Sequence, residues 1–274
     1  MKFAICQELY ELTPWSEQCR LIAEAGYTGI EAAPFALGTD PAALSAADCE
    51  QFRSHAARHG LQIIGLHWLL AKTQGLHLTS PDPAVRRRTA DHLRALARLC
   101  SGLGGSIMVL GSPNQRNLLE GVSQEQALDH AAEVLLACTD EFAERGVTLC
   151  FEPLTPKETN FINTCAEAAE LLQRINHSTV QLHQDVKAML GAESDSIPEL
   201  IHRYRSITRH FHVNDSNLLG PGMGDTDYRP ILQALIDSDY SGWVSVEVFD
   251  YSPGAQHIAL QSLSYMRRIL AECC

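Results

Sequence analysis

No stretch of this 274-residue sequence approaches the roughly 18 consecutive apolar residues of a membrane-spanning helix. The N-terminal residues also lack the basic segment followed by an apolar one that is typical of a secretory signal. No CxxC pair occurs among the nine cysteines, and their number is odd. Both features favour free, buried thiols over a disulfide framework. We therefore expect a cytoplasmic protein that has no membrane partner.

Positive charge is scarce in this chain. It has 21 lysines and arginines against 33 aspartates and glutamates, which gives a formal net charge of -12. Affinity for nucleic acid comes largely from a basic surface, so this balance argues against a nucleic-acid partner. It does not exclude a phosphorylated substrate, because one local cation can bind a phosphate. The hydrophobic share of 45% is ordinary for a globular protein that buries a sizeable core.

The chain contains no Ser/Gly-rich linker, low-complexity tract or abrupt change of composition that would divide it. It repeats a short apolar segment, a polar loop and an amphipathic segment with apolar residues at helical spacing. The apolar segments lack proline and are mostly rich in Val, Ile, Leu or Phe, which is typical of strands buried on both faces of a parallel sheet. The predicted strands are Lys2–Gln7, Thr28–Ala33, Leu61–His67, Ser106–Gly111, Val147–Glu152, Val180–Asp185, His210–Asn214 and Val244–Val248.

Predicted helices lie between these strands. Several are followed by glycine, as at Gly26 and Gly146, which is the expected stop before a strand. Eight alternations of strand and helix predict an α/β fold, a closed (β/α)8 TIM barrel that forms a single domain over residues 1–274. An open, doubly wound sheet is the alternative. The predicted helices are Ser16–Ala25, Pro41–His59, Pro83–Leu103, Gln124–Arg145, Ala166–Ile175, Ile197–Arg205, Tyr228–Ile236 and Pro253–Leu270.

Four consecutive strands in the second half carry candidate metal ligands at or near their carboxyl ends, namely Glu152, Asp185, His212 and Glu247. The spacings between them are 33, 27 and 35 residues, each about one strand and one helix, which places the four on adjacent strands at a similar height. Three converging carboxylates repel one another unless a cation binds them. One histidine with three carboxylates suits a divalent ion, first Mn²⁺ or Mg²⁺, with Co²⁺ or Zn²⁺ as further candidates.

Other polar side chains are expected near the same edge of the barrel. His183 and His210 lie two residues before Asp185 and His212, so strand alternation directs them into the barrel interior. We expect both to be hydrogen-bonded core histidines. Substrate contacts are predicted for one residue at the end of the third strand and three in the loop after the fourth: His67, Ser112, Gln115 and Arg116. A structural ion pair is the alternative for the arginine.

At these residues the sequence resembles the xylose-isomerase-like barrels, the sugar phosphate isomerase/epimerase superfamily that includes D-tagatose 3-epimerases and inosose dehydratases. The resemblance covers essentially the whole barrel and is most specific from residue 147 onward. In the epimerases Glu, Asp, His and Glu at the matching places bind the metal, which supports the four predicted ligands. The segments that carry the resemblance are Phe151-Glu152-Pro153-Leu154, Leu182-His183-Gln184-Asp185, His210-Phe211-His212-Val213-Asn214-Asp215 and Gly242-Trp243-Val244-Ser245-Val246-Glu247.

The resemblance implies an isomerase or epimerase that acts on a keto- or aldo-sugar or a derivative. In such enzymes the metal holds a ketone and a neighbouring hydroxyl, which acidifies the adjacent C–H and stabilises an enediolate. Glu152 and Glu247 would lie on opposite sides of the substrate and exchange its proton. Glu158 resembles a family position that contacts substrate hydroxyls. The chain departs from the epimerases at Ala188, in place of a substrate-binding histidine, and at Leu218, in place of an arginine.

These departures keep a second function open, that of a metal-dependent lyase. A lyase uses the same enediolate to eliminate water or an alcohol, as inosose and dehydroshikimate dehydratases do, and an oxidised glycoside would also fit. Lys187, beside the site, is a candidate either to donate a hydrogen bond to the substrate or to protonate a departing oxygen. The acidic charge disfavours a three-metal endonuclease, and a non-catalytic metal-binding protein is the remaining alternative. The expected partner is a small carbohydrate, and a homo-oligomer is left open.

Overall fold

The computed structural model describes residues 1–38 and 43–273 of the chain. Its eight parallel strands form a closed barrel in sequence order, with β1 paired to β8 through Phe3 and Val244 and their neighbours. The prediction of a (β/α)8 barrel is confirmed, and the open sheet is excluded. The strands are β1 (Lys2–Cys6), β2 (Gly29–Ala32), β3 (Gln62–Leu66), β4 (Ile107–Leu110), β5 (Thr148–Phe151), β6 (Val180–Asp185), β7 (Thr208–Val213) and β8 (Trp243–Val246).

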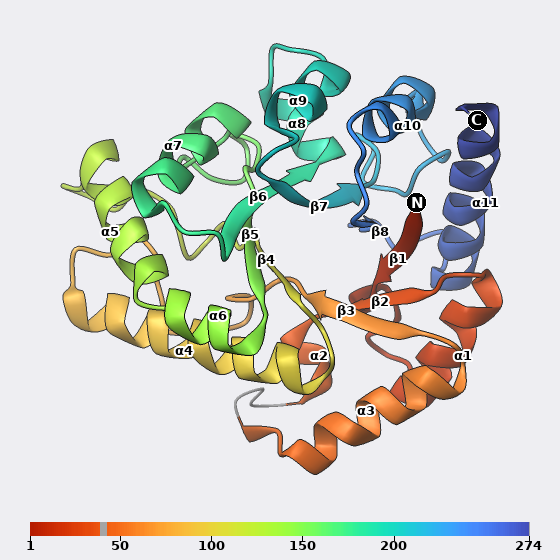
Figure 1. Ribbon diagram of the computed structural model, residues 1–274, viewed down its shortest axis with the longest axis horizontal. Helices are drawn as coiled ribbons and strands as arrows, with labels where there is room; N and C mark the ends of the chain where they lie inside the picture. Colours follow the sequence, from red (N-terminus) through yellow and green to blue (C-terminus); the bar gives the residue numbers. More distant parts are fainter. Residues whose placement is uncertain (39–42, 274) are drawn as a thin grey trace.

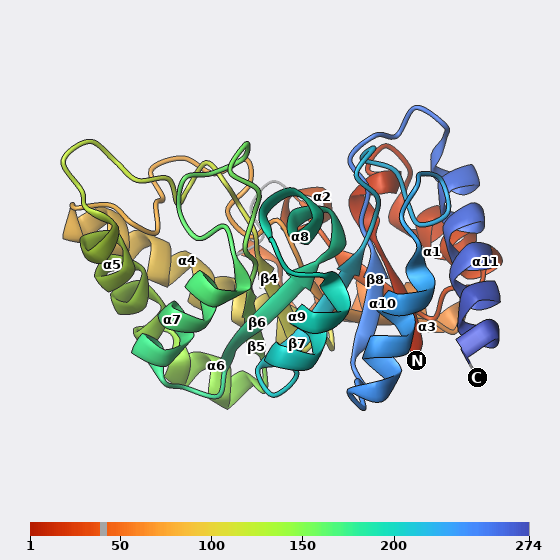
Figure 2. The same cartoon turned by 90° about the horizontal axis from the view of Figure 1, so that it is seen from above.

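The carboxyl ends of these strands meet at one edge of the barrel, where barrel enzymes place their chemistry. Across the β6–β7 pair Asp185 lies opposite His212, and across the β7–β8 pair His212 lies opposite Ser245. Glu152 directly follows β5, and Glu247 directly follows β8. Figure 2 shows the long loops that follow the strands gathered along its upper edge. The predicted ligands are therefore carried by four adjacent strands on the loop side of the barrel.

Helices surround the strands on the outside of the barrel (Figure 1). Their buried faces are apolar, as in α4, where Leu93, Leu96 and Cys100 point to the core. The start of β1 and the end of α11 lie side by side in both Figure 1 and Figure 2. The helices are η1 (Gln7–Tyr10), α1 (Trp15–Ala25), α2 (Pro34–Leu37), α3 (Ala46–Arg58), α4 (Pro83–Gly102), α5 (Gln124–Leu136), α6 (Thr139–Arg145), α7 (Cys165–Ile175), α8 (Val186–Ala192), α9 (Ile197–Tyr204), α10 (Tyr228–Asp237) and α11 (Ala255–Cys273).

The second predicted helix, Pro41–His59, starts later in the structure. Helix α3 begins at Ala46, because Ser45 and Asp48 form a capping box in which each side chain bonds the backbone of the other residue. Residues 41 and 42 of the predicted helix lie outside the described residues. The prediction of helical spacing is thus confirmed for the part of this segment that follows the cap.

The predicted helix over Gln124–Arg145 is wrong as a single element, since two helices occupy it. Helix α5 ends at Leu136 and α6 begins at Thr139. At the break the hydroxyl of Thr139 donates a hydrogen bond to the carbonyl of Leu136 at 2.9 Å, which is the kind of side-chain bond that competes with helix continuation. Apolar periodicity continues through the break, so the sequence pattern alone does not reveal it.

Three short helices, η1, α2 and α8, escape prediction from the sequence because four to seven residues contain too few turns to show a period. Helix α8 matters for the site. It follows β6 directly, and its N-cap is Asp185, whose Oδ1 accepts a hydrogen bond from the backbone N–H of Ala188 at 2.7 Å. The helix therefore orients one predicted metal ligand.

Over the described part of the chain, no helix is both long and apolar enough to cross a membrane. Seven cysteines of this part are free, buried thiols, namely Cys6, Cys19, Cys49, Cys100, Cys138, Cys150 and Cys165. The prediction of free thiols is confirmed for these residues. Their burial makes them packing groups of the core.

Candidate active site

Three of the four predicted metal ligands lie together at the loop side of the barrel. Glu152, Asp185 and His212 are buried, and their ligand atoms lie within 4.8 Å of one another in a group that also contains His183. The carboxylates come from the ends of β5 and β6 and the imidazole from β7. Glu152, Asp185 and His212 form the candidate metal centre.

The fourth predicted ligand, Glu247, lies on the other side of His212. Its Oε2 is 3.2 Å from Nδ1 of His212, and its Oε1 accepts a hydrogen bond from Nε1 of Trp68 at 3.1 Å. Its ligand atoms also fall within 4.8 Å of those of Cys6, Glu8 and His67. Glu247 is therefore next to the candidate metal centre through His212 but belongs to a separate group of possible donors.

The imidazole of His212 is held from inside the barrel by Glu31 of β2. Both carboxylate oxygens of Glu31 lie 3.2 Å from Nε2 of His212, and Oε2 is 2.8 Å from Nε2 of His210. Burial acts to raise the pKa of Glu31, but the two histidines outweigh it and hold the pKa well below its usual range. An ionised Glu31 that accepts Nε2–H of His212 leaves Nδ1 as the ring nitrogen that can bind a cation once it has lost its own proton.

Asp185 and Glu152 are also oriented by their surroundings. Oδ2 of Asp185 accepts a hydrogen bond from Nδ2 of Asn214 at 2.6 Å, and Asn214 in turn accepts the backbone N–H of Lys187 at 2.8 Å. Glu152 lies against the backbone of Gly111, where a Cβ would stand 1.7 Å from its Oε2. Only glycine leaves room for this carboxylate, which explains why the loop after β4 begins with it.

The pKa values of the three carboxyl groups of the site are shifted in different directions. Burial, with repulsion from Glu247 and Asp185, raises the pKa of Glu152 well above its usual value. Burial likewise raises the pKa of Asp185. Burial acts in the same direction on Glu247, but the attraction of His212 and other nearby cations outweighs it, and the pKa of Glu247 is lowered. Crowded carboxylates with raised pKa values and an oriented imidazole form a donor set that fits a divalent cation.

A cavity opens above these residues, and both glutamates line it. Its walls also include two of the predicted substrate contacts, His67 and Ser112. Nε2 of His67 lies 2.5 Å from Oε2 of Glu8, and the hydroxyl of Ser112 accepts a hydrogen bond from the backbone N–H of Leu70 at 3.0 Å. The full lining is His67, Trp68, Val109, Gly111, Ser112, Pro113, Glu152, Leu154, Glu158, Glu247 and Phe249.

The other two residues predicted in the loop after β4 do not line this cavity. Arg116 is 1% exposed and donates hydrogen bonds to the carbonyls of Glu152, at 2.6 Å, and Ile162, at 3.4 Å. The donors of Arg116 face the backbone that carries Glu152, so in this structure they are directed away from the cavity, and the substrate contact of Arg116 stays a prediction. Gln115 is partly buried, and its carbonyl accepts the N–H of Leu78 at 2.7 Å.

Glu158 and Lys187 form a pair at the rim of the site. Nζ of Lys187 donates to Oε1 of Glu158 at 2.8 Å and lies 4.0 Å from the centre of the Phe249 ring. Burial would raise the pKa of Glu158, but Lys187 lowers it below its usual value. Both residues line a second cavity with Leu218, beside the first. A pair of opposite charges at the edge of a cavity can bind and orient hydroxyl groups.

Several side chains of the site carry no clear signal in the sequence. Glu31 is the only acidic residue of the apolar segment Thr28–Ala33, and an acidic residue inside a buried strand is the one signal that could have identified it. Trp68 adopts a left-handed backbone conformation with φ of 55°, which is rare for a bulky residue and typical of functional sites. The pairing of Glu8 with His67 joins η1 to the residue that follows β3, and spacing along the sequence does not reveal it.

Comparison with curated proteins finds relatives that carry epimerase names. A D-psicose 3-epimerase of Ruminiclostridium cellulolyticum is 29% identical over 182 residues, which cover 63% of this chain and 59%, less than two thirds, of that protein. A ketose 3-epimerase of Arthrobacter globiformis is 26% identical over 227 residues, or 82% of this chain and 76% of that protein. A fructoselysine 3-epimerase of Escherichia coli O157:H7 is 23% identical over 276 aligned positions, 96% of both chains.

Solved structures share the fold at lower identity. A D-psicose 3-epimerase with D-tagatose from Clostridium cellulolyticum H10 superposes with a TM-score of 0.86 at 22% identity, over 98% of this chain and 99% of that one. The apo form of a 3-keto-D-glucoside 4-epimerase from E. coli gives 0.85 at 19% identity, over 98% and 99%. A family profile described as a xylose isomerase-like TIM barrel matches residues 19–269. The predicted resemblance is confirmed, and the chain belongs to the xylose isomerase-like TIM barrel family.

Proposed function

We propose that this protein is a divalent-metal-dependent isomerase or epimerase of a keto- or aldo-sugar or a derivative, working on a small carbohydrate in the cytoplasm. One observation carries the proposal: Glu152 and Glu247 line the same cavity, and Glu152 shares a group of candidate metal donors with Asp185 and His212. The names of the curated relatives support the same class of reaction.

The ion, with Mn²⁺ as the first candidate, would supply a positive charge that acidifies the C–H next to a carbonyl. The two glutamates move the proton. One glutamate, in its ionised form, takes the proton from one face of the substrate carbon, and the other returns a proton to the opposite face. Two carboxyl groups in opposite protonation states are what inversion at a single carbon requires.

The walls of the cavity suit a substrate with hydroxyl groups. Glu158 and Lys187 offer an acceptor and a donor at the rim, and His67 and Ser112 line the floor near Trp68. Charged hydrogen bonds to substrate hydroxyls orient the sugar, and the indole gives its carbon skeleton an apolar surface. The relatives act, by their names, on psicose, other ketoses and fructoselysine, so a free or substituted ketose is the first class to test.

A lyase is the second candidate, and Lys187 is the observation that favours it. Its ammonium group lines the second cavity next to Leu218, which stands where the epimerases have an arginine. Burial would lower the pKa of Lys187, but Asp185 and Glu158 raise it, so the group is charged and can give a proton to a departing oxygen. The same first step, removal of a proton by Glu247, would then end in elimination.

Proton NMR in D₂O separates these reactions. The protein is loaded with Mn²⁺ for assay, the ion is removed by chelation before spectra are recorded, and the panel contains ketoses, inososes and keto-glycosides. Deuterium in a recovered epimer supports the epimerase, whereas loss of water or of an aglycone supports the lyase. Absence of exchange at every carbon of the panel, in protein shown to bind Mn²⁺, would contradict proton abstraction.

A further inference from the structure

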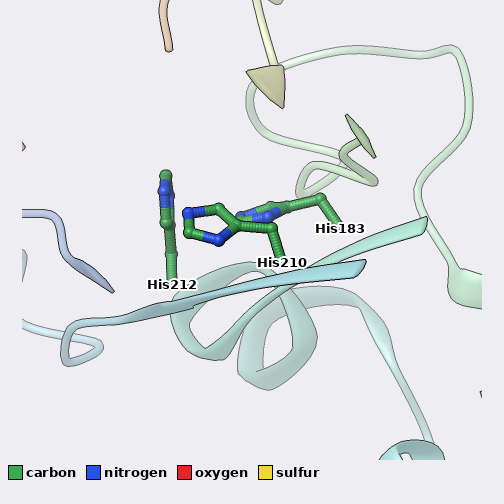
Figure 3. A group of neighbouring side chains, drawn as sticks. All are labelled: His183, His210 and His212. Atoms are coloured by element: carbon green, nitrogen blue, oxygen red, sulfur yellow. The ribbon is translucent and has the colours of Figure 1, made fainter. Parts of the chain in front are cut away.

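His183 lies in the interior of the barrel directly beneath the candidate metal centre. It is carried by β6, two residues before Asp185, and none of its surface is exposed. Its ring centre lies 4.2 Å from that of His212 and 5.3 Å from that of His210. Figure 3 shows the three side chains next to one another. The three rings are neighbours in the interior of the barrel.

The three histidines differ in their hydrogen bonds. His210 and His212 both bond the carboxylate of Glu31. Among the described residues neither Nδ1 nor Nε2 of His183 has a hydrogen-bond partner, so the expectation of a hydrogen-bonded core histidine is wrong for this residue. A fully buried imidazole with two unpaired nitrogens is unfavourable, and such groups in native proteins are usually paired with protein, water or an ion.

The nitrogens of His183 lie beside donors that already suit a cation. Nε2 is 4.0 Å from Oε1 of Glu152, and a ligand atom of the ring lies within 4.8 Å of ligand atoms of Glu152, Asp185 and His212. Metal–nitrogen and metal–oxygen bonds are about 2.0–2.2 Å long, so two donors on opposite sides of one ion stand roughly 4.0–4.3 Å apart. The distance from Nε2 of His183 to Glu152 falls at this separation.

We propose that His183 is a further ligand of the divalent ion, through Nε2. The inference rests on the proposed metal site and adds a nitrogen donor that the four-residue set predicted from the sequence does not contain. Two imidazoles with carboxylates favour Co²⁺ or Zn²⁺ over Mn²⁺ more strongly than one imidazole does, because nitrogen ligands gain more than carboxylates along this series of ions. His183 therefore acts on metal choice as well as on affinity.

The test is calorimetric titration of metal-free protein with Co²⁺ and with Mn²⁺. His183→Leu removes both nitrogens and leaves an apolar side chain of similar size, and His183→Gln serves if the leucine variant does not fold. Cys150→Ala is the matched control, because Cys150 is fully buried in β5 two residues before Glu152, as His183 is before Asp185. Circular dichroism establishes that each variant is folded.

We expect His183→Leu to weaken Co²⁺ binding at least about tenfold, and to weaken Mn²⁺ binding less, so that the ratio of the two affinities falls. A disturbed fold would weaken the binding of both ions alike, and the same loss of affinity would be seen in Cys150→Ala. An unchanged ratio of affinities in a folded His183 variant would overturn the proposal. A buried water would then be the expected hydrogen-bond partner of the His183 ring. Wild-type protein that binds neither ion would instead contradict the proposed function itself.

Electron paramagnetic resonance of the Cu²⁺-loaded protein gives a second, independent readout. Nitrogen ligands split the copper signal, and we expect the pattern of two nitrogens in the wild type and of one in His183→Leu. The same number of nitrogens in both proteins would overturn the assignment of His183 as a ligand. This measurement does not depend on catalysis, so it holds whichever reaction the enzyme performs.

Discussion

Both carboxylate oxygens of Glu31 lie 3.2 Å from Nε2 of His212, at a depth in the barrel where neither side chain is exposed. When a buried carboxylate accepts the N–H of one ring nitrogen, the other ring nitrogen is the one that can bind a metal. Replacing Glu31 with Gln keeps the size of the side chain and removes its charge. We expect the affinity for Mn²⁺ to fall about 10–100-fold, as measured by calorimetric titration of the folded variant.

A change of less than about twofold would show that Glu31 does not orient His212. Gln233→Glu on the outer helix α10 is a suitable control for altered charge, because Gln233 bonds only its helix neighbour Asp237 at 2.8 Å among the contacts described.

Glu247→Gln tests the proton transfer. The amide keeps the hydrogen bond from Trp68 but cannot accept a proton, so deuterium exchange into substrate should fall about 10²–10⁴-fold. The measurement is the rate of exchange in D₂O with the ion bound. Glu120→Gln, in the exposed part of the loop after β4, is the matched control. Full activity in Glu247→Gln with metal retained would favour a non-catalytic metal-binding protein.

Metal affinity should rise with pH. Burial and two neighbouring carboxylates raise the pKa of Glu152 well above its usual value, so the ion-free protein keeps a proton there that the metal must displace. Below that raised pKa, affinity should fall at least about tenfold for each unit of pH, because the proton of Glu152 competes with the ion, as do any protons held by Asp185 and His212. Calorimetric titrations in buffers of different ionisation enthalpy measure the proton released. Binding that releases no proton under these conditions would contradict this account, and Glu152→Gln should lower the number of protons released.

Gly111→Ala tests the close contact between the loop after β4 and Glu152. The new methyl group would stand 1.7 Å from Oε2 of Glu152, so the carboxylate must move. We expect weaker metal binding and at least about a tenfold loss of exchange activity, since small displacements of catalytic groups are costly. Gly38→Ala is the control, because among residues 1–38 and 43–273 its added Cβ meets only Leu44, at 3.8 Å. Unchanged metal affinity in Gly111→Ala would show that Glu152 does not bind from this position.

Lys187→Met separates the two proposed reactions. In an epimerase this lysine only binds the substrate, so KM should rise by about tenfold, the value of one charged hydrogen bond, with kcat little changed. In a lyase it protonates the leaving oxygen, so kcat for elimination should fall instead. Lys187→Arg keeps the charge next to Glu158 and should restore most of the binding. Steady-state kinetics on the substrate found by NMR give kcat and KM. Unchanged values of both in Lys187→Met would show that Lys187 neither binds the substrate nor takes part in the reaction.

The strands and the candidate metal ligands could be predicted because both depend on local order along the chain. Apolar segments without proline repeat with helical segments between them, and a closed barrel is the arrangement that buries all eight. Glu152, Asp185, His212 and Glu247 follow from the same repeat, because the carboxyl ends of parallel strands share one edge. The short helices and the break between α5 and α6 depend on single caps and side-chain bonds, which apolar periodicity does not record.

Only the tertiary structure decided which side chains meet across the barrel. Glu31 reaches His210 and His212 over 179 and 181 residues of sequence, and no spacing rule pairs β2 with β7. Arg116 looked like a substrate contact by its position, yet its donors turn to the backbone at Glu152. The sequence by itself determined the barrel and the edge where its polar residues gather. The directions of the side chains and their pairing inside the barrel were decided by packing, because closure of the barrel brings together strands that are distant in the chain.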